Sequence, residues 1–196
     1  MPMLISKKGT MGERGQLQKE LYLARSMTDR ANILTVSLRD NEPKWHDLKF
    51  DVGMCCEAAL RASFEAAGEI GARGEVSILL SSDSVIARLN SKYRGVEGPT
   101  NVLSFPADSA ASRFESEIPP LLGDIVVAFE TLVEEAEAAR ITMQAHLAHM
   151  VVHGALHLLG FDHQVEAEAE VMEQLEVESL QSLGIGSPYM ESSLRG

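Results

Sequence analysis

The chain has 196 residues, enough for one folded domain with a sizeable core and too few for two ordinary domains. Its 45% hydrophobic and 23% charged residues are typical of a soluble globular protein, and no apolar run approaches the ~20 residues of a membrane-spanning helix. The net charge of −12 argues against broad, non-specific binding of nucleic acid, which relies on clustered Lys and Arg.

The chain opens with a segment unlike the rest. Residues 1–30 contain six basic and three acidic side chains and lack sustained helical or strand periodicity, so we expect a flexible tail. Met27 stands just before the first strand-like run, and a biological start there is a hypothesis that mass spectrometry of the native N-terminus tests. We predict a single domain over residues 31–190. Because the first thirty residues lack the apolar core of a secretory signal, we expect a cytoplasmic protein with neither a membrane nor DNA as partner.

The hydrophobic pattern beyond the tail predicts strands mixed with helices, followed by helices alone. In chain order we predict a strand at 33–38, a helix at about 49–67, a strand at 75–80, a helix capped by Ser82 or Asp83 and running to about Tyr93, a strand at 102–105, a mobile loop of about fifteen residues ending at Pro119-Pro120, a strand at 123–128, and helices at 130–140, 143–159 and 165–183. This order indicates an α+β fold: one four-stranded mixed sheet packed with about five to six α-helices.

The two cysteines, Cys55 and Cys56, are adjacent within the first predicted helix. Neighbouring cysteines are poorly placed for a structural disulfide, and zinc-binding pairs are normally separated by two to four residues. We therefore predict two reduced thiols in a helix.

The most informative segment carries histidines at helical spacing. His153 and His157 lie one turn apart on the same helix face, where two imidazoles can share one tetrahedral ion. Gly160 accepts the left-handed conformation of a sharp turn, which ends the helix and lets the chain deliver His163 as a third ligand. The segment therefore predicts a zincin-like metal site of three histidines.

Three protein nitrogens leave the fourth position of zinc open, as in catalytic rather than structural sites. Water in that position has a lowered pKa, so hydrolysis is the expected chemistry. One Zn²⁺ per chain suits three imidazoles best, although Ni²⁺ or another divalent ion such as Cu²⁺ also binds such sites.

Three further polar residues lie near the predicted ligands. His146 and His149 share the ligand face but extend away from it, so they either support the ligands by hydrogen bonding or belong to the core. Asp162, beside the third ligand, could orient a histidine or the bound water, or help to start the last helix.

One feature departs from zinc peptidases with this spacing. The pattern H-x-x-x-H-x-x-G-x-x-H matches theirs, but Gly154 stands where H-E-x-x-H peptidases have their general base. Peptide hydrolysis by the ordinary route should be crippled, and a metallopeptidase-like hydrolase is disfavoured.

Several motifs in the same chain order resemble the YbeY family of bacterial endoribonucleases that mature ribosomal RNA. They are the run from His146 to His163, Leu89-Asn90, Tyr93-Arg94-Gly95, the run from Pro99 to Pro106, and Leu122-Gly123-Asp124-Ile125-Val126. The resemblance spans about residues 33–190.

The resemblance implies a zinc-dependent endoribonuclease specific for single-stranded RNA. Its expected roles are maturation of the 3′ end of 16S rRNA in the small ribosomal subunit and ribosome quality control, with a ribosomal protein and an assembly GTPase as partners. The implied catalytic set is Arg94 with His153, His157 and His163.

A functional role for Arg94 is also supported by its chemistry, because a guanidinium can bind phosphate in a planar, bidentate manner. The alternative is that Arg94 forms an ordinary ion pair at the surface. Arg88, Lys92 and Asn101 are further candidates for RNA contact, and each has an ordinary structural reading: a solvated helix face for Arg88 and Lys92, a loop cap for Asn101. Either metal-activated water or the ribose 2′-OH could attack the phosphate, and the two routes stay open.

Two alternatives compete. The first is the metallopeptidase-like hydrolase that Gly154 disfavours. The second is a ribosome-assembly factor with a structural metal and no intrinsic nuclease activity. The acidic last helix, whose glutamates are Glu166, Glu168, Glu170, Glu173, Glu176 and Glu178, could meet a basic partner or simply form a solvated face.

Overall fold

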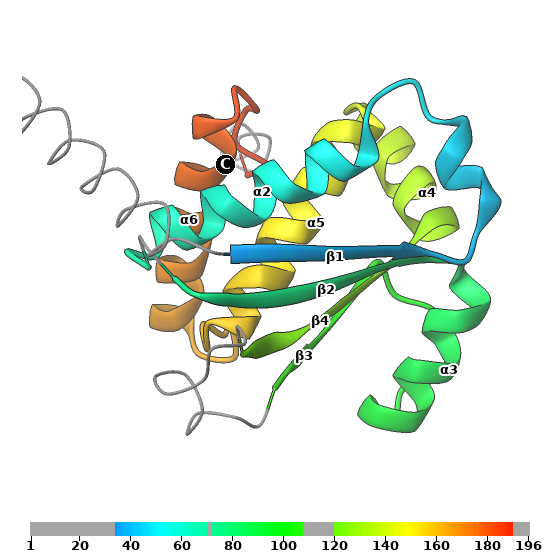
Figure 1. Cartoon of the computed structure of the whole chain (residues 1–196), viewed down its shortest axis with the longest axis horizontal. Coiled ribbons are helices and arrows are strands. Elements are labelled where there is room, and N and C mark those ends of the chain that lie inside the picture. Colours follow the sequence, from blue (N-terminus) through cyan, green and yellow to red (C-terminus); the bar gives the residue numbers. More distant parts are fainter. Residues whose placement is uncertain (1–33, 70–71, 108–119, 190–196) are drawn as a thin grey trace, which may run out of the picture.

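A computed structural model describes residues 34–69, 72–107 and 120–189 (Figure 1). Four strands form one mixed sheet in the order β1-β2-β4-β3. Their bounds are Leu34–Asp40 for β1, Gly74–Ser81 for β2, Val102–Pro106 for β3 and Leu121–Ala128 for β4. β1, β2 and β4 run parallel to one another, and β3 pairs antiparallel with β4.

Five α-helices and one short 3₁₀ helix accompany the sheet within the described ranges. Their bounds are Pro43–Asp47 for η1, Val52–Ala66 for α2, Asp83–Arg94 for α3, Phe129–Ala139 for α4, Met143–Leu158 for α5 and Glu166–Ser182 for α6. The predicted fold class, one four-stranded mixed sheet with five to six helices, is confirmed. The pattern did not predict η1, which is too short for a periodic signal and holds buried Trp45 against the carbonyl of Ser81.

The helices divide unequally between the two faces of the sheet (Figure 1). α2, α5 and α6 pack over one face and enclose the main core, into which β2 points Val76, Ile78 and Leu80. α3 lies against the other face with a much smaller cluster around Ile86. The predicted reduced thiols, Cys55 and Cys56, are free and buried on α2 within the main core.

Helix α5 is the centre of the molecule and the element that positions the histidines. Its N-cap is Thr142, whose hydroxyl accepts the backbone N–H of Ala145 at 3.1 Å. Packing against α2, α6, α4 and the sheet buries most of its surface, including Leu147, Val151 and Leu156 at 0% exposure. A helix enclosed in this way cannot rotate, so side chains on its remaining face are held in place.

The start of α3 differs in detail from the prediction. Ser82 occupies the N-cap position but makes no side-chain capping bond, because its hydroxyl contacts that of Ser84. The carboxylate of Asp83 instead accepts hydrogen bonds from the backbone and hydroxyl of Thr131 on α4. Asp83 therefore connects α3 to α4, and Ser82 occupies the N-cap position without a capping bond from its side chain.

Some predictions fall on other parts of the chain. The flexible tail over 1–30, the start at Met27 and most of the loop before Pro120 lie outside the described residues. Among the helices that the structure does describe, none is both long and apolar enough to cross a membrane.

Candidate metal centre

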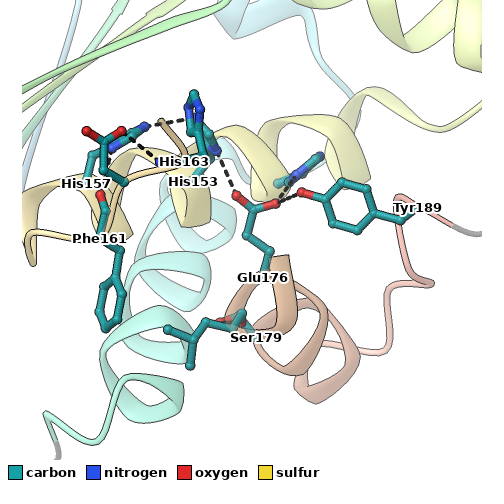
Figure 2. Close-up of polar contacts among 10 residues, drawn as sticks. His153, His157, Phe161, His163, Glu176, Ser179 and Tyr189 are labelled. Atoms are coloured by element: carbon teal, nitrogen blue, oxygen red, sulfur yellow. Dashed lines mark hydrogen bonds and ion pairs between the residues drawn. The ribbon is translucent and has the colours of Figure 1, made fainter. Parts of the chain in front are cut away.

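The three predicted ligands converge at the C-terminal end of α5. His153 and His157 project from one face of the helix, with their Nε2 atoms 3.1 Å apart. His163 approaches from the following turn, and one nitrogen from each of the three imidazoles lies within 4.8 Å of the other two. Figure 2 shows the three rings grouped together at this end of the helix.

The turn after α5 both ends the helix and supports a ligand. Gly160 has φ +94, a left-handed conformation that L side chains rarely adopt, and the N–H of Phe161 returns to the carbonyl of Leu156 at 3.0 Å. The carbonyl of Phe161 accepts a hydrogen bond from Nδ1 of His157 at 2.9 Å. The same turn therefore brings His163 to the site and orients His157.

The hydrogen bonds fix the tautomers of the two helical histidines. Nδ1 of His153 contacts the carboxylate of Glu176 at 2.7 Å, and Nδ1 of His157 contacts the carbonyl of Phe161. Ionised carboxylates and carbonyls only accept hydrogen bonds, so each Nδ1 carries the proton and each Nε2 presents a lone pair. Burial and the neighbouring His153 lower the pKa of His157, which favours its neutral, metal-binding form.

Two lone pairs facing each other at 3.1 Å repel unless a cation lies between them. Two nitrogens bound to one tetrahedral zinc at about 2.0–2.1 Å lie about 3.3 Å apart, close to this separation. The chemistry of the donor set therefore fits a divalent metal held by His153, His157 and His163.

Glu176 is the main residue of the centre that sequence reasoning missed. Its carboxylate lies on α6, is 1% exposed, and bridges Nδ1 of His153 and Nε2 of His149 (Figure 2). The prediction that the acidic face of α6 is solvated or meets a partner is therefore wrong for this residue. A signal existed, because Met172, Glu176 and Leu180 recur at intervals of four and share one buried stripe.

Tyr189 completes the surroundings of that carboxylate with a hydrogen bond from its hydroxyl. Burial by itself would raise the pKa of Glu176, but the hydrogen bonds from His149, His153 and Tyr189 outweigh it and hold the pKa at about 2. The carboxylate is therefore ionised. Burial, with the Glu176 hydrogen bond, raises the pKa of Tyr189, which stays a donor.

Arg94 reaches the site from α3. It is the last residue of α3, and its Nη2 donates to the carbonyl of Ser104 on β3 at 3.3 Å. Arg94 and the three histidines line one open cleft of about 550 Å³, together with Asn101. The amide of Asn101 donates to the carboxylate of Glu135 at 3.0 and 3.2 Å, while its oxygen accepts the N–H of Val102, so the side chain is anchored at the edge of the cleft.

The other two basic candidates lie apart from this cleft. Arg88 is exposed and its guanidinium donates to the carbonyl of Ser84 in its own helix, and the amine of Lys92 stands 4.8 Å from the ring of Tyr93. Neither lines the cleft. A role for these two in RNA contact remains a prediction.

Asp162 and His146 stabilise local structure. The carboxylate of Asp162 accepts the backbone N–H of His163 at 2.8 Å and the amide of Gln164, and the first of these bonds lowers its pKa. His146 contacts Glu135 on α4 at 2.7 Å through Nε2. Asp162 thus shapes the turn that presents the third ligand, and His146 joins α5 to α4.

Close packing against the sheet explains why position 154 is a glycine. A Cβ at this position would stand 2.9 Å from Oγ of Ser104 and 3.0 Å from Cγ2 of Ile125, closer than side chains normally approach. The position faces the sheet and not the cleft. A glutamate side chain there would have to displace β3 and β4 before it could act as a base.

The fold and the site together define a mixed-sheet protein with a three-histidine centre beside an arginine-lined cleft. The family model described as Endoribonuclease YbeY matches residues 38–184. A Bradyrhizobium sp. protein named Endoribonuclease YbeY is 42% identical over 148 residues, covering 75% of this chain and 87% of its own. One of the same name from Bartonella bacilliformis is 39% identical over 159 residues, covering 81% and 99%.

Among solved structures, the solution structure of a Thermotoga maritima protein matches with a TM-score of 0.47 and 26% identity, covering 78% of this chain and 92% of its own. The extent of the family match decides the assignment. The chain belongs to the Endoribonuclease YbeY family.

Proposed function

We propose that this chain is a metal-dependent endoribonuclease acting on single-stranded RNA, with zinc as its metal. The observation that carries the proposal is the pair of Nε2 lone pairs that face each other beside a third imidazole, on the wall of a cleft that also holds Arg94. Membership of the Endoribonuclease YbeY family supplies the substrate class.

His153, His157 and His163 would hold the metal. When bound, zinc supplies Lewis acidity that stabilises negative charge developing on a phosphate and lowers the pKa of water. The chain itself must then keep the imidazoles neutral and bring the phosphodiester to them. Burial and the neighbouring His153 favour the neutral form of His157, and the acceptors at both Nδ1 atoms leave each Nε2 free to face the metal.

Arg94 is suited to bring the phosphodiester to the imidazoles. A guanidinium has five N–H donors in a planar fork, and the contact with Ser104 occupies one of them. The remaining donors suit a phosphate in the cleft and would stabilise the charge that builds up during transfer. Asn101, held by Glu135 at the edge of the same cleft, is suited to bind a neighbouring part of the RNA.

For the biological role we propose maturation of the 3′ end of 16S rRNA and ribosome quality control in the cytoplasm. The net charge of −12 suits a protein that reaches its RNA through partners on the small ribosomal subunit, such as a ribosomal protein or an assembly GTPase. In cells that lack the protein, 16S rRNA with an unprocessed 3′ end should accumulate, and the His157→Ala variant should not correct it.

The decisive test compares RNA cleavage by the wild type with that by three variants that fold. His157→Ala removes a ligand, and Arg94→Ala removes the phosphate contact. Arg61→Ala is the matched arginine control, since Arg61 is exposed on α2, where it pairs with Glu57 and donates to the carbonyl of Leu34, away from the cleft. We expect loss of cleavage in the first two, by about 100-fold or more, and no change in the third. Equal cleavage by all four proteins would assign the activity to a contaminant and favour the assembly factor.

Product ends separate the two chemical routes. A 2′,3′-cyclic phosphate would exclude direct attack by water and identify the ribose 2′-OH as the nucleophile. A 3′-hydroxyl or a simple phosphomonoester formed without a cyclic precursor would favour water.

A further inference from the structure

Glu176 lies where a carboxylate is costly to place. It is 1% exposed on α6, inside the main packing layer between that helix and α5. An ionised carboxylate buried without compensation is strongly unfavourable, so its surroundings must offset the loss of water. A residue placed there only for packing would be apolar, as its neighbours Met172 and Leu180 are.

Three donors surround this carboxylate (Figure 2). Nδ1 of His153 contacts Oε1 at 2.7 Å, Nε2 of His149 contacts Oε2 at 2.9 Å, and the hydroxyl of Tyr189 also donates to Oε2. The three donors come from two separate parts of the chain, α5 and the segment after α6. Together they fix the carboxylate in position and orientation.

The contact with His153 has a chemical consequence beyond packing. It keeps the proton on Nδ1, so the lone pair of this imidazole is on Nε2, the nitrogen that faces His157 at 3.1 Å. A hydrogen bond from a ligand's second nitrogen to a carboxylate also makes the imidazole a stronger donor to a metal. The carboxylate further places a negative charge one ring away from the three-histidine cluster.

We propose that Glu176 is a positioning residue for the metal centre: it holds His153 as the Nδ1–H tautomer and points its Nε2 at the metal, while His149 and Tyr189 keep the carboxylate in place. The inference rests on the metal binding in the proposed function. His149 thereby acts on the centre through Glu176, and Tyr189 connects the segment after α6 to it.

The first test is the affinity for Zn²⁺ of metal-stripped protein, measured by competition with a chromophoric chelator. Glu176→Gln keeps the size of the side chain, removes the charge and replaces one of the two acceptor oxygens by an amide donor. Glu178→Gln is the matched control, because Glu178 is exposed on the same helix and accepts a hydrogen bond from the side chain of Gln174, away from the histidines. We expect about 10–100-fold weaker binding in Glu176→Gln and a change of less than about twofold in Glu178→Gln. Unchanged affinity in a folded Glu176→Gln protein would overturn the proposal.

A second measurement needs no variant. Long-range ¹H–¹⁵N spectra of metal-free wild type report which nitrogen of His153 is protonated, and we expect Nδ1. Protonation at Nε2 would overturn the proposal even if Glu176→Gln does not fold. If wild type fails to bind zinc while His153 shows the Nδ1–H tautomer, the proposed metal dependence fails and the positioning of His153 by Glu176 stands.

Discussion

Two glutamates contact histidines of α5, and they differ in almost everything but that contact. Glu176 on α6 is 1% exposed and bridges His149 and His153, whereas the side chain of Glu135 on α4 is 40% exposed and contacts His146 at 2.7 Å. The first carboxylate stands behind a predicted metal ligand. The second anchors Asn101 at the rim of the cleft.

The two contacts are of similar length and differ in burial: Glu176, behind the histidine cluster, is 1% exposed, and Glu135, beside the loop of Asn101, is 40% exposed. Water can replace the partners of Glu135, so its contacts contribute little to folding. Water cannot reach Glu176, so each of its partners depends on it. The contrast leads to four predictions, in order of decreasing effect.

Replacing each glutamate with alanine should give the largest difference between them, measured as the loss in free energy of unfolding. Glu176→Ala removes the buried carboxylate that His149, His153 and Tyr189 share as an acceptor, and we expect a loss of roughly 3–4 kcal/mol in the free energy of unfolding. Glu135→Ala should cost less, about 1 kcal/mol, because the carboxylate of Glu135 is 40% exposed and already partly solvated. Urea denaturation of the metal-free proteins measures both values, and similar losses would remove the distinction.

Lowering the pH should reduce the free energy of unfolding, because it protonates the carboxylate of Glu176. Its pKa of about 2 lies below the ordinary value of 4.5, so the ionised carboxylate stabilises the fold. That contribution is complete above about pH 4.5 and is lost as the pH falls towards 2, a total of roughly 3 kcal/mol. The difference in unfolding free energy between metal-free wild type and Glu176→Gln should therefore shrink over this range. A difference independent of pH would show that the charge is not what stabilises the fold.

The other side of α5 provides the third prediction. The face that carries the histidines can be held in place only if the opposite face, with Gly154, sits tightly against the sheet. Gly154→Ala should reduce the unfolding free energy by roughly 1–2 kcal/mol, since the clash with Ser104 and Ile125 exceeds the gain in helix propensity. Gly186→Ala, where a Cβ meets nothing within 4 Å, is the control. Thermal melting compares them, and a more stable Gly154→Ala would contradict this packing.

The smallest effect concerns Glu135. Glu135→Gln should leave zinc affinity unchanged and weaken RNA binding by about 2–5-fold, because Asn101 loses a charged anchor worth up to about 1 kcal/mol. Titration of a short single-stranded RNA into the metal-loaded protein measures this. A large loss of zinc affinity in the same variant would mean that both glutamates support the metal.

Local patterns predicted the ligands but not what holds them. The spacing of His153, His157 and His163 with the glycine turn lies within eleven consecutive residues, so helix geometry and one local turn bring the three rings together. The contacts of Glu176 and Tyr189 depend on how α6 packs against α5, which is a tertiary property. The reason for Gly154 is also tertiary. In the sequence this glycine indicates that the general base of a peptidase is missing, whereas in the fold it allows α5 to pack closely against β3 and β4.

The sheet and helices were predicted for a similar reason. Alternating apolar residues define β2, and long apolar periodicity defines α5. The part-buried hydrogen bonds between Asn101 and Glu135 join residues 34 positions apart and leave no periodic trace in the sequence.

The most direct test of this account is a titration of Zn²⁺ into metal-stripped wild type, with bound metal and cleavage of single-stranded RNA followed in the same samples. The account predicts that cleavage rises in proportion to bound zinc and saturates at about one ion per chain, and that His157→Ala shows neither the binding nor the rise. Full cleavage by the metal-stripped wild type, or saturation of binding without any cleavage, would contradict it.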